Sequence, residues 1–309
     1  MSIASAPGGR SRGRSCLVTG ARGFLGQRLV PRLLEAGVRV TALDRQAGHV
    51  WPDGVESIQG DLSRPGWAQG MRSAWRWDDV IHLAGPVSKG AATFAEEAKV
   101  ARAHVQLALA LHQALPQGWG GRLIHTSSMV VYGTAVELPV RETQELSPRF
   151  SYALGKALAE DVWISATLPD LWLLRLPGLF SATRRWGALF QFIGAGLEGR
   201  PIRLTATEPT PWDILHVDDA AEAISRVLDC PLSFQGAMNV SYGEVVELEG
   251  IAQRIARLTR NVDVINETRV SHPPFQLDIA RARSRFAWPP CSLEQRLEEL
   301  VRTLGAERG

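Results

Sequence analysis

The sequence predicts an α/β protein built on a doubly wound parallel sheet, with a smaller C-terminal lid interleaved with it. Three observations predict this fold class. From residue 15 to residue 176, short β-rich runs alternate with longer helical runs, and a glycine-rich turn separates the first strand from the first helix. After residue 176 the alternation ends, and proline, glycine and arginine become frequent. Strands that alternate with helices of this length form a parallel sheet covered on both faces, with a ligand crevice at the carboxyl ends of the strands.

Each element follows from the spacing of its apolar residues. In the first part of the chain we expect strands at residues 16–19, 38–44, 55–59, 79–83, 122–126 and 171–176, and helices at residues 24–36, 91–115 and 152–167. Pro116 and Gly118 end the long helix at 91–115. In the second part we expect helices at residues 188–197, 217–228, 251–258 and 293–304, and a strand at residues 238–240.

The overall composition excludes several classes of protein. With 45% hydrophobic residues the chain buries too much apolar surface to be disordered, and a net charge of +2 gives no basic excess for nucleic acid or an anionic membrane. No apolar run approaches the length of a membrane span. Three widely spaced cysteines and scattered histidines indicate no disulfide framework and no metal site. We therefore expect a cytoplasmic protein without a metal.

The glycine-rich turn is the first motif that carries chemistry. Its sequence is TGARGFLG, in which Gly20, Gly23 and Gly26 lie between the first strand and the first helix. Glycines there allow a tight turn, and the free N–H groups of the helix face a pyrophosphate. The turn therefore predicts a dinucleotide, bound also by Arg22, Phe24 and Leu25.

The end of the second strand indicates which dinucleotide. Asp44 lies 18 residues beyond Gly26. A carboxylate there accepts hydrogen bonds from the ribose hydroxyls and repels a 2′-phosphate, which favours NAD. Arg22 and Arg45 keep NADP open, because either guanidinium can bind that phosphate. Asp61, followed by Leu62 after the third strand, is expected near the adenine.

These features divide the chain into parts. We expect a disordered arm at residues 1–14, which are rich in glycine, serine and arginine and lack the apolar stretch of a signal peptide. Residues 15–177, with parts of 213–243, then form the dinucleotide-binding Rossmann domain. Residues 178–212 and 244–309 form the substrate-binding domain.

A tyrosine and a lysine four residues apart supply the catalytic hypothesis. On a helix, Tyr152 and Lys156 share one face, with Cβ atoms about 5–6 Å apart. A free phenol, with a pKa of about 10, is a poor base at neutral pH, but an adjacent ammonium favours the phenolate. Lysine occurs only at residues 89, 99 and 156, so its presence here is informative. Ser128, at the end of the fifth strand, is expected to donate to the substrate oxygen.

With these motifs the chain resembles the extended short-chain dehydrogenase/reductase family, the NAD-dependent epimerase/dehydratase group. The resemblance also rests on the GDL turn at Asp61 and on the segments HLAG, SSMVVYG, YALGK, LRLP, ILHVDD, MNV and LD. It implies that Tyr152 is the acid/base, that Lys156 holds the nicotinamide ribose and that Ser128 orients the substrate. The resemblance further implies cofactor contacts from residues Leu83, Ala84, Gly85 and Pro177.

Departures from the family narrow the reaction. Met129 and Val130 stand where the sugar 4,6-dehydratases of this family carry an acidic pair, which disfavours a dehydratase. The 5-epimerase/4-reductase branch uses a cysteine near this loop, and none is present here. Gly178 and Trp212 replace an asparagine and an arginine that nucleotide-sugar epimerases use on the diphosphate, so arginines elsewhere would have to supply those contacts. The expected substrate-binding residues are Ser88, Ser128, Met129, Gly178, Arg185, Trp212 and Arg269.

These observations favour an enzyme that oxidises and reduces a sugar carbinol carbon with NAD. The preferred hypothesis is a sugar or nucleotide-sugar epimerase that acts through a transient ketone. The alternatives are a dehydrogenase or ketoreductase of another hydroxy or keto compound, and a non-catalytic dinucleotide sensor. The family resemblance implies a homodimer formed through the helices at 91–115 and 152–167.

Overall fold

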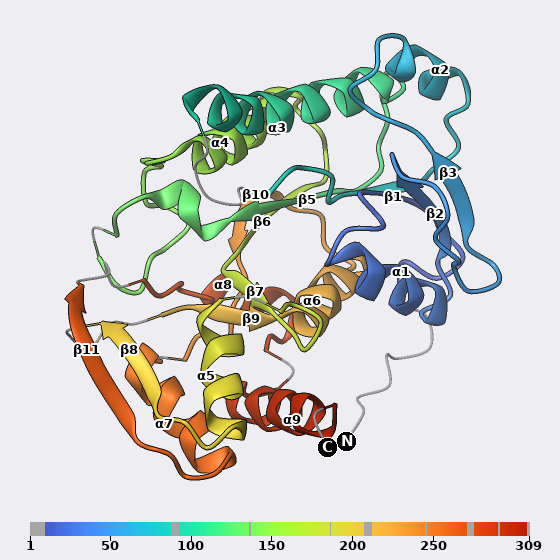
Figure 1. Cartoon of the computed structure of the whole chain (residues 1–309). Coiled ribbons are helices and arrows are strands. Elements are labelled where there is room, and N and C mark those ends of the chain that lie inside the picture. The colour runs from blue at the N-terminus through green and yellow to red at the C-terminus, as the bar shows by residue number, and fades with distance from the viewer. Residues whose placement is uncertain are drawn as a thin grey trace. The chain divides into compact units, whose positions relative to one another are not determined.

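The chain folds into two compact units (Figure 1). The computed structural model describes residues 10–87, 93–135, 137–185, 187–206, 212–244, 246–270, 275–289 and 291–307, with the backbone alone at 205–206 and 267–270. Unit 1 comprises Met1–Gly133, Glu145–Leu176 and Ala220–Met238. Unit 2 comprises Thr134–Gln144, Pro177–Asp219 and Asn239–Gly309.

A seven-stranded sheet is the centre of unit 1, and its strand order is β10-β6-β5-β4-β1-β2-β3. The strands are β1 (Ser15–Thr19), β2 (Arg39–Asp44), β3 (Glu56–Gln59), β4 (Asp79–His82), β5 (Leu123–Ser128), β6 (Leu171–Leu176) and β10 (Gln235–Asn239). The pairs that join β3, β2, β1, β4, β5 and β6 are all parallel. The order reverses direction at β1 and β4, which places the ligand crevice of a doubly wound sheet at their carboxyl ends.

Helices cover both faces of this sheet. Figure 1 shows α3 (Phe94–Ala114) and α4 (Ser151–Ser165) on one face, and α1 (Gly26–Glu35) and α6 (Val217–Asp229) on the other. The short helices α2 (Trp67–Ser73) and η1 (Met129–Tyr132) complete the unit. Fully buried Leu111 of α3 and Trp163 of α4 pack with Leu17, Val80 and Leu123 of the strands in one core cluster. The interior strands are buried along nearly their whole length, polar Asp79, His82 and His125 included, because both faces of the sheet are covered.

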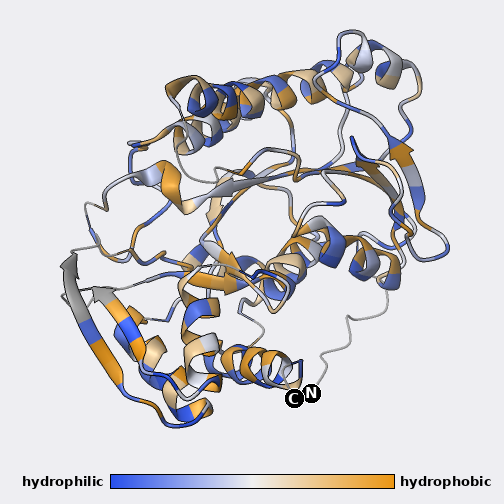
Figure 2. Cartoon of the chain, viewed as in Figure 1, coloured by the Kyte–Doolittle hydropathy of each residue, from blue (hydrophilic) through white to orange (hydrophobic). Residues whose placement is uncertain are grey.

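Unit 2 contains two small parallel sheets and four helices among its described residues. Its elements are β7 (Gly178–Phe180), α5 (Ala188–Leu197), β8 (Ile202–Ala206), β9 (Ile214–His216), α7 (Leu248–Leu258), β11 (Val264–Val270), α8 (Ala280–Phe286) and α9 (Leu293–Ala306). Strand β7 pairs with β9, and β8 pairs with β11. In α9, hydrophobic and hydrophilic residues alternate at helical spacing (Figure 2), and Ser292 and Gln295 form a capping box at its start.

The structure confirms the predicted fold class, and every predicted strand and helix is present with its ends shifted by a few residues. Sequence reasoning missed α2, β7, β8, β9, β11 and α8. Helix α2 begins after a left-handed Gly66 and contains Gly70, both signals of a loop. The two strands β7 and β9 have three residues each, which is too short to show alternation.

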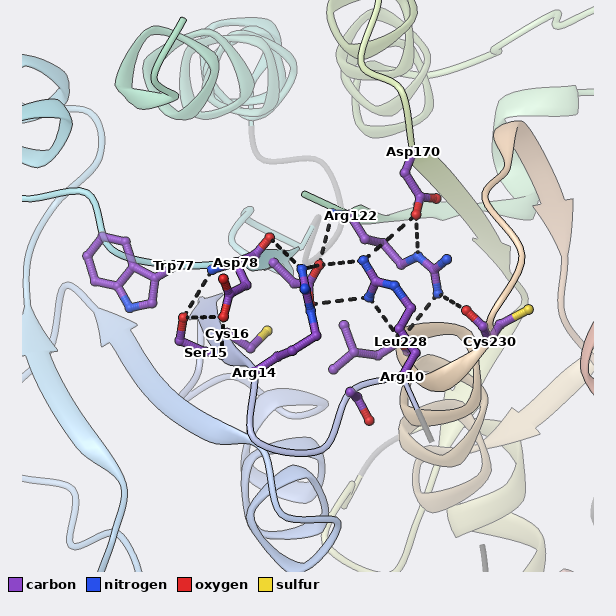
Figure 3. A network of polar contacts seen from close by, with 12 residues as sticks. Arg10, Arg14, Ser15, Cys16, Trp77, Asp78, Arg122, Asp170, Leu228 and Cys230 are labelled. Atoms are coloured by element: carbon purple, nitrogen blue, oxygen red, sulfur yellow. Dashed lines mark hydrogen bonds and ion pairs between the residues drawn. The ribbon is translucent and has the colours of Figure 1, made fainter. Parts of the chain in front are cut away.

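Part of the predicted disordered arm at 1–14 is ordered, which corrects that prediction. Residues 10–14 are held against the sheet by Arg10 and Arg14, both labelled in Figure 3. The two guanidinium groups pair with buried Asp79, at 3.0 and 2.7 Å. Ser11 is buried and its hydroxyl donates to Asp229 at 2.9 Å. Residues 1–9 lie outside the described residues.

The predicted domain boundary also changes at one segment. Residues 134–144 were assigned to the Rossmann domain, but they belong to unit 2. The backbone of Val140 forms a parallel bridge with Leu277, and the side-chain amide of Asn239 donates to the Val140 carbonyl at 2.9 Å. Hydrogen bonds to partners distant in the sequence therefore decide where this segment folds.

Candidate active site

The glycine turn after β1 forms a cradle that only glycine permits. Gly20 has φ +70°, and a Cβ atom at this position would lie 2.7 Å from both N and Cα of Ala84. A Cβ atom on Gly26 would lie 2.3 Å from the carbonyl oxygen of Ala21. Because backbone occupies both positions, the turn is held tightly against residue 84 while helix α1 begins directly at Gly26. These residues, with Gly23, Phe24 and Leu25 between them, fit the pyrophosphate of a dinucleotide.

Asp44 ends β2 and is fixed beside this turn. Its carboxylate accepts hydrogen bonds from the backbone N–H groups of Arg22 at 3.1 Å and Gln46 at 3.0 Å. The Arg22 guanidinium is turned to the carbonyl oxygen of Ala47. These two hydrogen bonds fix the Asp44 carboxylate beside the glycine turn, an arrangement that fits NAD better than NADP.

We predict that Asp44→Asn narrows the preference for NAD over NADP. The amide keeps the shape of the side chain but removes the charge that repels a 2′-phosphate, so the ratio of the two dissociation constants should change by about 10-fold, or about 1.4 kcal/mol. Titration of both cofactors by tryptophan fluorescence measures this ratio. Asp53→Asn is the matched control, because Asp53 is exposed and has no predicted cofactor contact. An unchanged ratio in Asp44→Asn contradicts the assignment.

Asp61 and Leu62 follow β3. The Asp61 carboxylate accepts hydrogen bonds from the hydroxyl of Ser63 at 2.6 Å and its backbone N–H at 3.0 Å, and these bonds lower the pKa of Asp61. Leu62 is buried in the core cluster. The side chain of Arg45 is exposed at the end of β2.

Tyr152 and Lys156 lie one turn apart near the start of α4. The Lys156 ammonium donates to the backbone carbonyl of Thr126 in β5 at 2.7 Å, and its nitrogen lies 6.0 Å from the centre of the Tyr152 ring. Burial lowers the pKa of Lys156 to about 8, against the opposing charge of Glu160. The carbonyl of β5 therefore anchors a cation beside the phenol ring.

Ser128 is the last residue of β5, two residues after Thr126, whose carbonyl accepts the hydrogen bond from Lys156. Its hydroxyl accepts from the N–H of Val130 at 3.5 Å and caps η1, which starts at Met129. Residues Leu83 to Pro86 form the neighbouring turn, after β4. There the N–H of Leu83 donates to the Thr19 carbonyl at 3.1 Å, and β4 lies between β1 and β5. The carboxyl ends of β1, β4 and β5 thus bring the predicted catalytic residues and the glycine turn to one edge of unit 1.

The histidines predicted to be structural are buried and neutral. Burial lowers the pKa of His82 to about 3 and that of His125 well below its usual value, and in unit 2 burial also lowers the pKa of His216. His104 was missed by the sequence reasoning, although it too is buried and contacts Tyr152. Its spacing to Ala108 and Leu111 on the buried side of α3 was the available signal.

In unit 2, a cavity of about 140 Å³ joins two of the predicted substrate residues. Gly178 and Trp212 both line it, together with Phe180, Phe190 and Arg184. Arg185 does not line this cavity, since its guanidinium pairs with Glu307 at 2.6 Å. Pro177 precedes β7, Arg269 lies in β11 with its side chain outside the described residues, and Ser88 falls wholly outside them.

Two further searches covered the described part of the chain. No cluster of three or more histidine, cysteine, aspartate or glutamate side chains there is arranged to hold a metal ion. None of the described helices has the length and apolar character needed to span a bilayer. In the described part of the chain, Cys16, Cys230 and Cys291 form no disulfide.

Comparison with known proteins identifies the class. The family model of the NAD dependent epimerase/dehydratase family matches residues 16–241, and the chain belongs to this family. This match confirms the family resemblance found in the sequence.

Individual relatives are similar over different lengths. UDP-glucose 4-epimerase of Mycolicibacterium smegmatis is 28% identical over 89% of this chain and 93% of its own length. UDP-glucose 4-epimerase 3 of rice is 29% identical over 56% of this chain, which spans only about half, 51%, of the rice protein. Among solved structures, UDP-glucose 4-epimerase from Thermotoga maritima superposes with a TM-score of 0.80 at 21% identity, covering 96% of this chain and 100% of that one. The NAD complex of the enzyme WbmG from Bordetella bronchiseptica gives 0.78 at 20% identity, covering 97% and 96%. These two likenesses establish the shared fold.

Proposed function

We propose that this protein is an NAD-dependent epimerase that inverts a carbinol carbon of a nucleotide-linked sugar through a transient ketone. The observation that carries the proposal is the arrangement of Tyr152, Lys156 and Ser128 around the end of β5, beside a glycine turn that fits a dinucleotide. The curated relatives named as UDP-glucose 4-epimerases support the substrate class.

The residues of unit 1 supply the proton chemistry. The Tyr152 phenolate accepts the proton of the substrate hydroxyl as the carbinol C–H bond is broken, and it returns this proton to the same oxygen when the ketone is reduced. The Lys156 ammonium stabilises the phenolate, and the Ser128 hydroxyl donates to the substrate oxygen. Bound NAD supplies the hydride acceptor and donor, so a complete turnover leaves it unchanged.

An assay of epimerisation tests the proposal. The purified protein is incubated with UDP-glucose, UDP-galactose or UDP-N-acetylglucosamine, and the products are separated by chromatography while absorbance at 340 nm is followed. We expect a C4 epimer without net formation of NADH. Stoichiometric NADH, or no epimer from any of the three sugars, contradicts it.

A dehydrogenase or ketoreductase is the second candidate, and the cavity in unit 2 favours it. Gly178 and Trp212 stand there in place of two polar diphosphate ligands expected in nucleotide-sugar epimerases, and the cavity is lined mainly by apolar and aromatic side chains. D-erythronate dehydrogenase of Cupriavidus necator is 33% identical over 47% of this chain. Net reduction of external NAD by a small hydroxy acid or sugar would establish this activity. Bound NAD without turnover of any substrate would favour a sensor.

We also propose that the protein is a homodimer in the cytoplasm, where cysteines that form no disulfide stay reduced. The support for the dimer is an exposed apolar surface on α3 and α4. Its large side chains are Leu109, Leu154, Leu158 and Ile164, each at least 41% exposed. A second copy that packs its own α3 and α4 on this surface would bury them from water.

The expected result for Leu154→Glu/Leu158→Glu is a folded monomer, because two carboxylates in an apolar interface are costly to desolvate. Light scattering coupled to size-exclusion chromatography measures the mass, and circular dichroism checks the fold. Leu232→Glu is the control, since Leu232 is also exposed (53%) but lies outside this surface. A wild-type protein that is monomeric at every concentration removes the dimer from the proposal.

A further inference from the structure

His104 has an arrangement that ordinary core packing does not explain. It lies in the middle of α3 and is only 2% exposed. Its Nε2 atom is 3.0 Å from the carbonyl oxygen of Pro86. A carbonyl only accepts hydrogen bonds, so Nε2 carries the proton and Nδ1 carries the lone pair of a neutral ring. Among the described residues Nδ1 has no hydrogen-bond partner.

The ring touches the turn that follows β4. A Cβ atom built on Gly85 would lie 2.4 Å from Cε1 and 2.6 Å from Nδ1 of His104. The imidazole therefore fills the space that a side chain at residue 85 would need. Together with the hydrogen bond to Pro86, this contact fixes two successive residues of the turn from one side.

The same ring also contacts the proposed acid/base. The centres of the His104 and Tyr152 rings are 5.3 Å apart, and their planes meet at 74°, an edge-to-face contact. The imidazole thus lies between the turn at 83–86 and the phenol on α4. A rigid ring at this position sets the distance between the turn and the Tyr152 phenol. Hydride and proton transfer are sensitive to such distances.

A charged imidazole would not serve this purpose. Burial, with the positive charge of Lys156 as a second cause, lowers the pKa of His104 to about 3, although the hydrogen bond to Pro86 opposes the shift. Lys156, His82 and Tyr152 are the titratable groups that face the ring, and there is no carboxylate among them to stabilise an imidazolium. The ring therefore stays neutral over the working pH range, and no second cation competes with Lys156.

We propose that His104 is a positioning residue of the active site, which holds the turn at 83–86 and the Tyr152 ring in register through its Nε2–H group. This inference rests on the proposed function, because it assigns His104 a role through Tyr152. A leucine would fill the same space without burying a half-bonded imidazole, so packing alone does not account for the residue.

Three variants separate the hydrogen bond from the packing. In His104→Gln the amide nitrogen reaches the position of Nε2 and can still donate to Pro86. In His104→Asn the amide is too short, and His104→Phe keeps the ring but has no donor. We expect kcat within about threefold of the wild type for His104→Gln, and a loss of about 10- to 100-fold for the other two with KM little changed. Equal losses in all three variants, or a loss confined to KM, would overturn the proposal.

A second measurement is independent of turnover. In ¹⁵N NMR of the wild-type protein we expect His104 to be the neutral Nε2–H tautomer down to about pH 5. Hydrogen exchange at residues 83–87 should be faster in His104→Asn and His104→Phe and unchanged in His104→Gln. The opposite tautomer, or exchange that does not distinguish the variants, refutes the role of His104 even if no sugar is turned over. Absence of epimerisation with the expected NMR and exchange results refutes only the proposed function.

Discussion

Replacing Tyr152 with phenylalanine should lower kcat by about 10²- to 10⁴-fold, the range that a positioned acid/base contributes. The substitution removes one oxygen atom and keeps the ring, whose contacts with His104 and Phe150 therefore persist. The melting temperature and the affinity for NAD should change little. Initial rates measure kcat, thermal unfolding monitored by circular dichroism measures the melting temperature, and titration by tryptophan fluorescence measures the affinity for NAD.

Lys156→Met is the companion to this variant. It removes the ammonium that stabilises the phenolate, so kcat should fall by a comparable factor. With its pKa lowered to about 8, the ammonium is present below that pH and is lost as pH rises through it. The wild type should therefore lose activity on the alkaline side from about pH 8, and the residual activity of Lys156→Met should lack this decline. Turnover within a few fold of the wild type in either variant would remove the pair from the mechanism.

Unit 1 was readable from the sequence because its determinants are local. The alternation of strand and helix patterns predicts the parallel sheet, and the Gly20 turn, Asp44 and Tyr152 each follow a predicted strand or lie on a predicted helix. Contacts between residues distant in the sequence could not be predicted from it. The need for glycine at residue 20 comes from the backbone of Ala84, and the role argued for His104 depends on a turn 18 residues earlier in the chain.

Unit 2 was less predictable for the same reason. The cavity joins residues from β7, the segment before β9, α5 and α9, which are scattered over more than a hundred positions of the sequence. Arg184 and Arg185 are adjacent, and nothing in the sequence distinguishes one from the other as a ligand contact. Only Arg184 lines the cavity, because Arg185 pairs with Glu307, which follows α9. A choice between neighbouring arginines depends on packing that no spacing rule encodes.

The largest loss of stability is expected at Arg122, at the amino end of β5 and away from the catalytic residues. Its side chain is fully buried, and its Nε donates to Asp170 at 2.9 Å (Figure 3). The other guanidinium nitrogens donate to the backbone carbonyls of Val227, Leu228, Cys230 and Leu232. One cation thus pairs with a carboxylate and donates to the last turn of α6 and the chain that follows it. It joins β5 to that segment.

Arg122→Met should lower the free energy of unfolding by about 3–5 kcal/mol, the cost of removing one partner from a buried ion pair. Methionine fills part of the space but removes the cation paired with Asp170 and the side-chain donor of several buried carbonyls. Urea unfolding measures the change. Arg76→Met is the control, because the pair of Arg76 with Glu56 is about half exposed on both sides and should contribute about 1 kcal/mol or less.

The double variant Arg122→Met/Asp170→Asn decides whether the loss comes from the unpaired charge. If it does, removing the carboxylate should recover part of the stability lost in Arg122→Met, because a neutral amide costs less to bury than an anion. The amide oxygen can still accept from the Trp172 indole, which donates to Asp170 at 2.7 Å. If the double variant is instead less stable by the sum of the single losses, the backbone carbonyls at the end of α6 and just after it account for the role of Arg122. A loss below about 1 kcal/mol in Arg122→Met would show that neither contribution is large.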